Sequence, residues 1–152
     1  MIAVRMLRPI FVITLLLGLA ACSGNGTGGG ILGGGPQPCN PGTSVTLAQP
    51  YPSGVTGVPT TIGQIIIVAN GSANTLHDNP SVWTITLNDN FGGFIVGSTL
   101  NPVPFPQGPH PYPSDFYYAS NIPTLNAGHG YTVLMSRTDG TCSAVAVGTF
   151  ST

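Results

Sequence analysis

The sequence predicts an all-β protein, a β-sandwich of about seven strands that follows a flexible N-terminal tether. Short runs rich in Val, Ile, Thr and Tyr recur from residue 44 onward, and Gly, Asn, Asp and Pro separate them at fairly regular spacing. No stretch shows the apolar period of a long helix. Short strands with regular turn signals are typical of a sandwich rather than of alternating strands and helices.

Two of the expected strands carry the clearest patterns. Residues 64–70, QIIIVAN, form a continuous apolar run, which indicates a central strand buried on both faces. Residues 82–88 alternate, so Trp83, Ile85 and Leu87 share one face and Trp83 is expected in the core rather than on a ligand platform. The remaining strands are expected over residues 44–48, 93–98, 116–120, 131–137 and 143–150.

The connections are marked by turn residues and by proline. Residues 88–93, NDNFGG, predict one hairpin turn, and Asp139 with Gly140 predicts another, because Asp-Gly is a strong hairpin signal. Residues 101–114, NPVPFPQGPHPYPS, are dense in proline. Proline lacks an amide donor and does not fit a central strand, so this whole segment is expected to be an extended surface loop.

The start of the chain has the parts of a secretory signal. Arg5 and Arg8 precede the apolar residues 10–19, and small residues follow. An apolar run of about ten residues is too short to cross a bilayer as a helix, which needs about 20. Leu-Ala-Ala-Cys at residues 19–22 resembles the bacterial lipobox. The alternative is an ordinary signal peptide that ends near a cysteine.

The lipobox resemblance implies that residues 1–21 are a cleaved lipoprotein signal peptide and that Cys22 carries a diacylglycerol group. The exported chain would then be held at a membrane, stably if two or more acyl chains are attached. Residues 22–38 are uncharged and rich in glycine, which indicates a flexible tether before a domain of residues 39–152. Ser23, in place of Asp, favours the outer membrane by the sorting rule of some Gram-negative families.

Charge excludes two classes of partner. The chain has no Lys and no Glu, and after cleavage only Arg137 and four Asp residues remain, a formal charge of −3. Nucleic acid requires Lys and Arg to neutralise its phosphates, so it is not expected as a partner. A polybasic membrane patch is excluded for the same reason, which leaves the lipid anchor as the expected membrane contact.

The cysteines divide into an anchor and a pair. If Cys22 is lipidated, Cys39 and Cys142 remain in an oxidising compartment, where a disulfide between them is expected. Two free buried thiols are the alternative.

Residues 125–133, LNAGHGYTV, match a tyrosine corner. In that motif Tyr131 turns inward at the start of a strand and its hydroxyl bonds the backbone upstream, while Leu125 plugs the core. A tyrosine that opens a strand by chance is the alternative. Together with residues 52–59, PSGVTGVP, and residues 148–152, GTFST, the segment resembles bacterial Ig-like domains of S-layer and other cell-surface proteins.

That resemblance implies an Ig-like or fibronectin-III-like Greek-key sandwich over about residues 50–152. In such a fold the start of the first strand and the turn before the last strand lie at the same pole. The expected disulfide between Cys39 and Cys142 would therefore join points that the fold already brings together.

No catalytic, cofactor or metal site is expected, so the chain is not predicted to be an enzyme. His77, His110 and His129 all lie in expected loops without metal-ligand spacing, and His77 with Asp78 is taken as a solvated loop. The Gly-x-Ser-x-Gly pattern of a serine nucleophile does not occur.

The function predicted is that of a membrane-anchored extracytoplasmic interaction or adhesion module. Phe105, Tyr112 and Tyr117, in and after the proline-rich segment, are the candidate surface for a protein or glycan partner. The alternative for these rings is packing against the sandwich. The alternative function is a structural spacer of the envelope that has no specific ligand.

Overall fold

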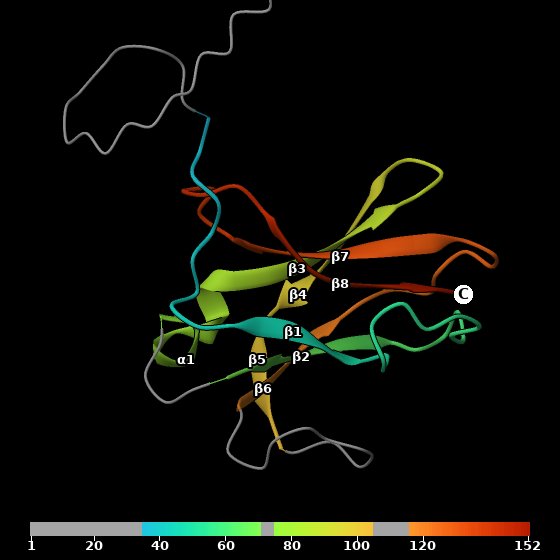
Figure 1. Cartoon of the computed structure of the whole chain (residues 1–152), viewed down its shortest axis with the longest axis horizontal. Coiled ribbons are helices and arrows are strands. Elements are labelled where there is room, and N and C mark those ends of the chain that lie inside the picture. Colours follow the sequence, from blue (N-terminus) through green and yellow to red (C-terminus); the bar gives the residue numbers. More distant parts are fainter. Residues whose placement is uncertain (1–34, 71–74, 105–115) are drawn as a thin grey trace, which may run out of the picture. The chain divides into compact units, whose positions relative to one another are not determined.

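A computed structural model of the chain describes residues 35–70, 75–104 and 116–152. These residues form two antiparallel four-stranded sheets, which Figure 1 shows as two layers of a β-sandwich. The prediction of an all-β sandwich is confirmed. A one-turn helix α1 (Thr75–Asp78) and a 3-10 turn η1 (Pro80–Val82) lie between the second and third strands.

The order of the strands is that of an immunoglobulin-like domain. The first sheet has the order β1-β2-β6-β5, with β1 (Val45–Gln49), β2 (Gln64–Ala69), β6 (Phe116–Asn121) and β5 (Asn101–Val103). The second has the order β4-β3-β7-β8, with β4 (Phe94–Thr99), β3 (Trp83–Asp89), β7 (Gly130–Arg137) and β8 (Val145–Ser151). These orders match the A-B-E-D and C′-C-F-G sheets of Ig domains and their Greek-key connections.

Burial follows the patterns in the sequence. Strand β2 is buried on both faces, as its apolar run predicts: Ile65 and Ile67 belong to the core between the sheets, and Ile66 and Val68 to a cluster on the other face. On β3, the alternating residues Trp83, Ile85 and Leu87 are all buried in the core. The prediction that Trp83 is a core residue is therefore confirmed.

The proline-rich segment holds a strand that the sequence analysis missed. Residues 101–103 form β5, which pairs with β6, so that Pro102 lies opposite Tyr118. The prediction of a loop over residues 101–114 is wrong for these three residues. Strand β5 is the last strand of its sheet, and an edge strand tolerates proline because one row of its backbone groups has no neighbour to bond. Residues 105–114 lie outside the described ranges.

The chain on both sides of β1 covers the outer edge of β8. Pro38 bridges Ser143 in parallel, and further on the Gly54 N–H donates to the Thr149 carbonyl at 2.6 Å. The predicted tether of residues 22–38 therefore ends in residues that already pair with the sandwich. Where β1 lies over β8, a Cβ on Gly148 would come within 2.5 Å of the Leu47 Cβ, so this close approach requires glycine.

Candidate functional site

Strand β3 connects two ends of the sandwich that differ in structure. It begins at Trp83, opposite Arg137, and finishes at Asp89, opposite Tyr131. Its seven residues span roughly 20 Å at the usual rise of a strand. We call the first the disulfide end and the second the hairpin end. Figure 1 shows the turn between β7 and β8 and the turn between β3 and β4 on opposite sides of the domain.

The disulfide end holds the N-terminal segment of the domain. Cys39 and Cys142 are bonded, with their Cα atoms 4.9 Å apart, which confirms the predicted disulfide. Backbone bonds accompany it: the Cys39 N–H donates to the Ser143 carbonyl, and the Ser143 N–H donates to the Gln37 carbonyl, each at 2.8 Å. The fold thus brings the two cysteines together and fixes the point at which the preceding chain joins the sandwich.

Arg137, the one basic residue after the predicted cleavage site, is used at this same end. Its guanidinium lies 5.7 Å from the centre of the Trp83 ring and donates to Asp139 at 2.7 Å. The bonds from Arg137 and Thr141 hold the pKa of the Asp139 carboxyl well below its usual range. These charges pair with one another across the turn, as a structural cap over Trp83.

The hairpin end is built on a tight turn over residues 89–93. The Gly92 N–H donates to the Asp89 carbonyl at 2.9 Å, and the Asp89 N–H donates to the Gly93 carbonyl at 3.1 Å. This is the pattern of a type I turn with a glycine bulge, and Gly92 has the required positive φ of 101°. The turn raises Phe91 into solvent, where 72% of its surface is exposed.

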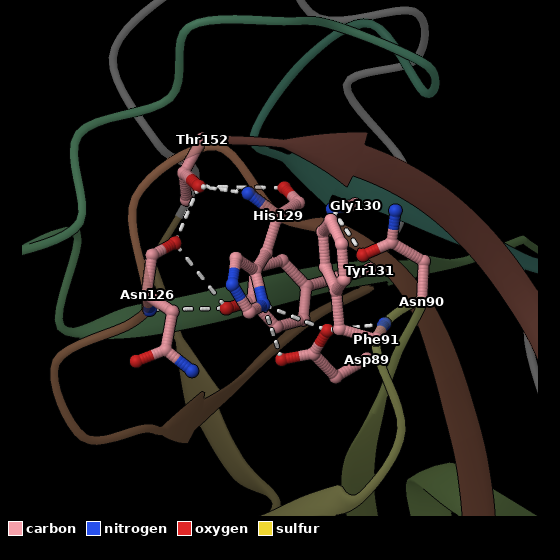
Figure 2. Close-up of polar contacts among 8 residues, drawn as sticks. All are labelled: Asp89, Asn90, Phe91, Asn126, His129, Gly130, Tyr131 and Thr152. Carbon is pink, nitrogen blue, oxygen red and sulfur yellow. Dashed lines mark hydrogen bonds and ion pairs between the residues drawn. The ribbon is translucent and has the colours of Figure 1, made fainter.

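The buried carboxylate of Asp89 joins this turn to the loop before β7. It accepts the Phe91 N–H at 2.9 Å and lies 2.8 Å from Nδ1 of His129. Figure 2 shows both contacts. Because an ionised carboxylate only accepts, the His129 Nδ1 carries the proton. The pKa of Asp89 is lowered, chiefly by the Phe91 N–H and then by His129, against the opposing effect of burial.

The loop before β7 has the geometry expected of a tyrosine corner. Buried Tyr131 accepts the Asn126 N–H through its hydroxyl at 3.0 Å, and Leu125 is buried in the core. Thr152, which follows β8, closes this loop, since its hydroxyl donates to the Asn126 carbonyl at 2.6 Å. Asn90 adds a further link, since its side-chain oxygen accepts the Gly130 N–H at 2.9 Å (Figure 2).

The His129 ring lies between two aromatic rings. Its centre is 4.4 Å from that of Phe91 and 6.3 Å from that of Tyr131. The sequence predicted His129 in a loop, without metal-ligand spacing, and gave no sign of its pairing with Asp89, which lies forty positions away. The signal available was indirect: strands C and F are neighbours in an Ig-like fold, which brings the end of β3 beside the start of β7.

Three exposed apolar side chains form the candidate binding surface. Phe91 lies on the turn, and Phe94 and Val96 follow on β4 with 69% and 67% of their surfaces exposed. We call these residues the hairpin patch. Phe94 and Val96 alternate with Ile95, which packs against the core, so they share the outer face of the edge strand of the sheet. Residues 90–99 carry no charge.

The aromatic surface expected from the sequence lies elsewhere and is different in character. Tyr117 is only 3% exposed and packs with Ile66, Val68 and Ala119 on the outer face of the first sheet. The expectation that Tyr117 presents its ring to a partner is wrong, because the pleat of β6 turns it into this cluster. Phe105 and Tyr112 lie outside the described residues.

His77 and Asp78 are exposed to solvent, as expected, but they form part of a helical turn and not of a loop. They belong to α1, where His77 Nδ1 lies 3.1 Å from the Tyr118 hydroxyl and the His77 ring contacts the tilted ring of Phe116, with their centres 4.0 Å apart. Burial, and then the charge of Asp78, raises the pKa of Tyr118. His110 lies outside the described ranges. Within those ranges, no three His, Cys, Asp or Glu side chains gather in a way that would hold a metal ion.

In the parts of the chain that the structure describes, no helix has the length and apolar character needed to span a membrane. Comparisons with family models, with curated proteins and with solved structures find no match to this chain. The lipid anchor and the Ig-like family therefore remain predictions from the sequence.

Proposed function

We propose that the chain is an exported lipoprotein, anchored to a membrane through Cys22, whose Ig-like domain is an interaction or adhesion module. The basic start, the short apolar run and the Leu-Ala-Ala-Cys sequence support the anchor. Ser23 favours the outer membrane as its location. The contact surface that we assign to the module is the hairpin patch.

The arrangement of the two ends is the observation that carries this proposal. The chain enters the sandwich at the disulfide end, and the hairpin patch lies at the other end of β3 and along β4. A domain held by its N-terminal segment thus presents a group of exposed apolar side chains away from the point of attachment. A spacer without a ligand would gain nothing from such side chains at that place.

The chemistry of the patch indicates the kind of contact. Single exposed apolar residues are common on protein surfaces, whereas grouped ones mark interaction sites. Without a charge over residues 90–99, binding would rest on apolar burial and backbone hydrogen bonds. Such binding should change little with ionic strength, because salt screens charges and not apolar contacts.

A photo-crosslinking amino acid at single positions tests the contact in cells that make and export the full chain. Placed at position 94 in place of Phe94, it should give discrete adducts on irradiation. Placed at exposed Thr46, on the other sheet, it should give none. An absence of adducts from position 94 would contradict the proposed contact surface and favour the spacer.

A further inference from the structure

We infer that β4 is a docking edge for a second copy of this chain, and that two β4 strands pair antiparallel about a two-fold axis through Ile95. The inference rests on the proposed function, since it names the partner of the hairpin patch. Three features support it: the other edge strands are protected from pairing, β4 has backbone N–H and C=O groups that do not bond to β3, and the side chains next to these groups are apolar.

Of the four edge strands, three are blunted. The segment over residues 53–58 and the bridge at Pro38 cover β8, as the bonds to Thr149 and Ser143 show. Strand β5 is three residues long and contains Pro102. Strand β1 is bulged and lies against β8. Proteins use short strands, proline, bulges and covering segments in this way to prevent pairing between edges.

Strand β4 lacks these devices over residues 94–96. It has no proline and no charge there, and its irregularity in pairing with β3 comes later, between Val96 and Thr99. Its exposed side chains are apolar, whereas an edge protected from pairing usually carries charge. Among the described residues no strand pairs with the outer edge of β4, so its part nearest the hairpin turn is open to another strand.

The register with β3 identifies the open backbone groups. Asp89 and Gly93 form a hydrogen-bonded pair at the turn. Bonded and non-bonded pairs alternate along an antiparallel ladder, so Leu87 with Ile95 is the next bonded pair. Phe94 and Val96 fall on non-bonded positions, and their N–H and C=O groups point away from β3.

The free N–H and C=O groups of Phe94 and Val96 can bond to the same groups of a second copy. When Ile95 lies opposite Ile95 of a second copy, Phe94 of each chain lies opposite Val96 of the other, and each such pair exchanges both N–H···O bonds. Their side chains then form aromatic and β-branched cross-strand pairs on the outer face, a favourable combination. No like charges meet, because residues 90–99 are uncharged. Pairing about Ile95 thus uses the open backbone groups and the exposed side chains of both copies at once.

The contact is short, so the dimer should be weak in solution. Stable interfaces bury about 1,200–2,000 Å² in total, more than a three-residue pairing supplies. Confinement of both copies to one membrane raises their effective concentration and strengthens the pairing without any new contact.

Sedimentation equilibrium of the full chain carrying Cys22→Ala tests the pairing without the lipid. We expect a monomer–dimer equilibrium that Val96→Lys weakens at least tenfold, because a lysine at this position places charges across the two-fold axis. Thr46→Lys on β1 adds the same charge at an exposed position and should leave the equilibrium unchanged. A monomer at all concentrations, or equal effects of the two lysines, would overturn the inference.

Cysteine crosslinking tests the register in the same Cys22→Ala background. Ile95→Cys should give a disulfide-linked dimer on mild oxidation, since non-bonded antiparallel partners have Cα atoms about 4.5 Å apart, within reach of a disulfide. Thr99→Cys should not. Crosslinking by Thr99→Cys alone would overturn the register. If the chain is monomeric and all photo-adducts from position 94 contain another protein, self-pairing is contradicted and the proposed function still stands.

Discussion

Asp89 shows how one buried carboxylate organises the hairpin end. Its backbone ends β3 and closes the turn, and its carboxylate accepts hydrogen bonds from the Phe91 N–H and from Nδ1 of His129. These bonds fix both the turn that exposes Phe91 and the loop that contains Tyr131. The carboxylate of Asp89, one of few charged groups in the chain, therefore connects two segments that are distant in the sequence.

The lowered pKa of Asp89 predicts a specific dependence of stability on pH. Because the folded pKa lies below the usual value of 3.8, the ionised form stabilises the fold above that value, and the contribution is lost as the pH falls through the folded pKa. Asp89→Asn should lower the melting temperature at pH 6 to 7, and the gap to wild type should close toward pH 2. Thermal unfolding followed by circular dichroism across this range measures it.

Asp78→Asn serves as the control for the loss of one negative charge, since Asp78 is exposed and lies outside this cluster. A gap between Asp89→Asn and wild type that stays constant from pH 7 to pH 2 would show that the carboxylate contributes by shape and not by charge.

The hydroxyl of Tyr131 provides a second test at this scale. Tyr131→Phe removes the acceptor of the Asn126 N–H and leaves that donor without its partner. The free energy of unfolding should fall by about 0.5–1.5 kcal/mol, the usual net contribution of one hydrogen bond, because the exposed Asn126 can turn to water instead. Tyr51→Phe, at a tyrosine that is 53% exposed, should leave urea denaturation unchanged. Equal stabilities of both variants would contradict a stabilising role for the Tyr131 hydroxyl.

At the scale of elements, periodicity was a good guide to the strands. The apolar run of β2 and the alternation of β3 predicted both their positions and their buried faces. Strand β5 could not be found in this way, because proline argues against a strand unless the strand is known to lie at an edge. Edge position is a property of the sheet and not of the local sequence.

The candidate site was less accessible to sequence than the fold. The pairing of Asp89 with His129 depends on the neighbouring positions of β3 and β7, which only the fold supplies. Tyr117 and Phe94 both lie on the outer faces of their sheets, yet Tyr117 is buried among Ile66, Val68 and Ala119 whereas Phe94 is exposed. Aromatic content predicted a surface on β6, and the exposed rings lie on β4 and its turn.

The disulfide is the element-scale feature with the largest expected effect on stability. It closes a separation of 103 residues, and removal of a native disulfide usually costs about 2–5 kcal/mol. Replacing Cys39 and Cys142 together by Ser should lower the midpoint of denaturation accordingly, and a reductant should do the same to wild type. Cys22→Ala, a cysteine change that leaves the bridge intact, should have neither effect. An unchanged midpoint in the double variant would mean that the backbone bonds at Ser143 hold the N-terminal segment without help from the disulfide.

For the molecule as a whole, the proposal assigns separate functions to the two ends of an almost uncharged domain. The single basic residue after the predicted cleavage site is paired with Asp139 at the disulfide end, and the apolar patch lies at the hairpin end. Contact with a partner would then depend on apolar surface and open backbone groups. The lipid on Cys22 would determine where that surface is displayed.

The attachment at Cys22 is the central claim, and the mass of the chain recovered from cells tests it most directly. Intact-mass analysis of the membrane fraction should find an N-terminus at Cys22 with the added mass of its acyl groups, and Cys22→Ala should abolish that species. A chain that begins at another residue, or that carries no lipid, would contradict the account.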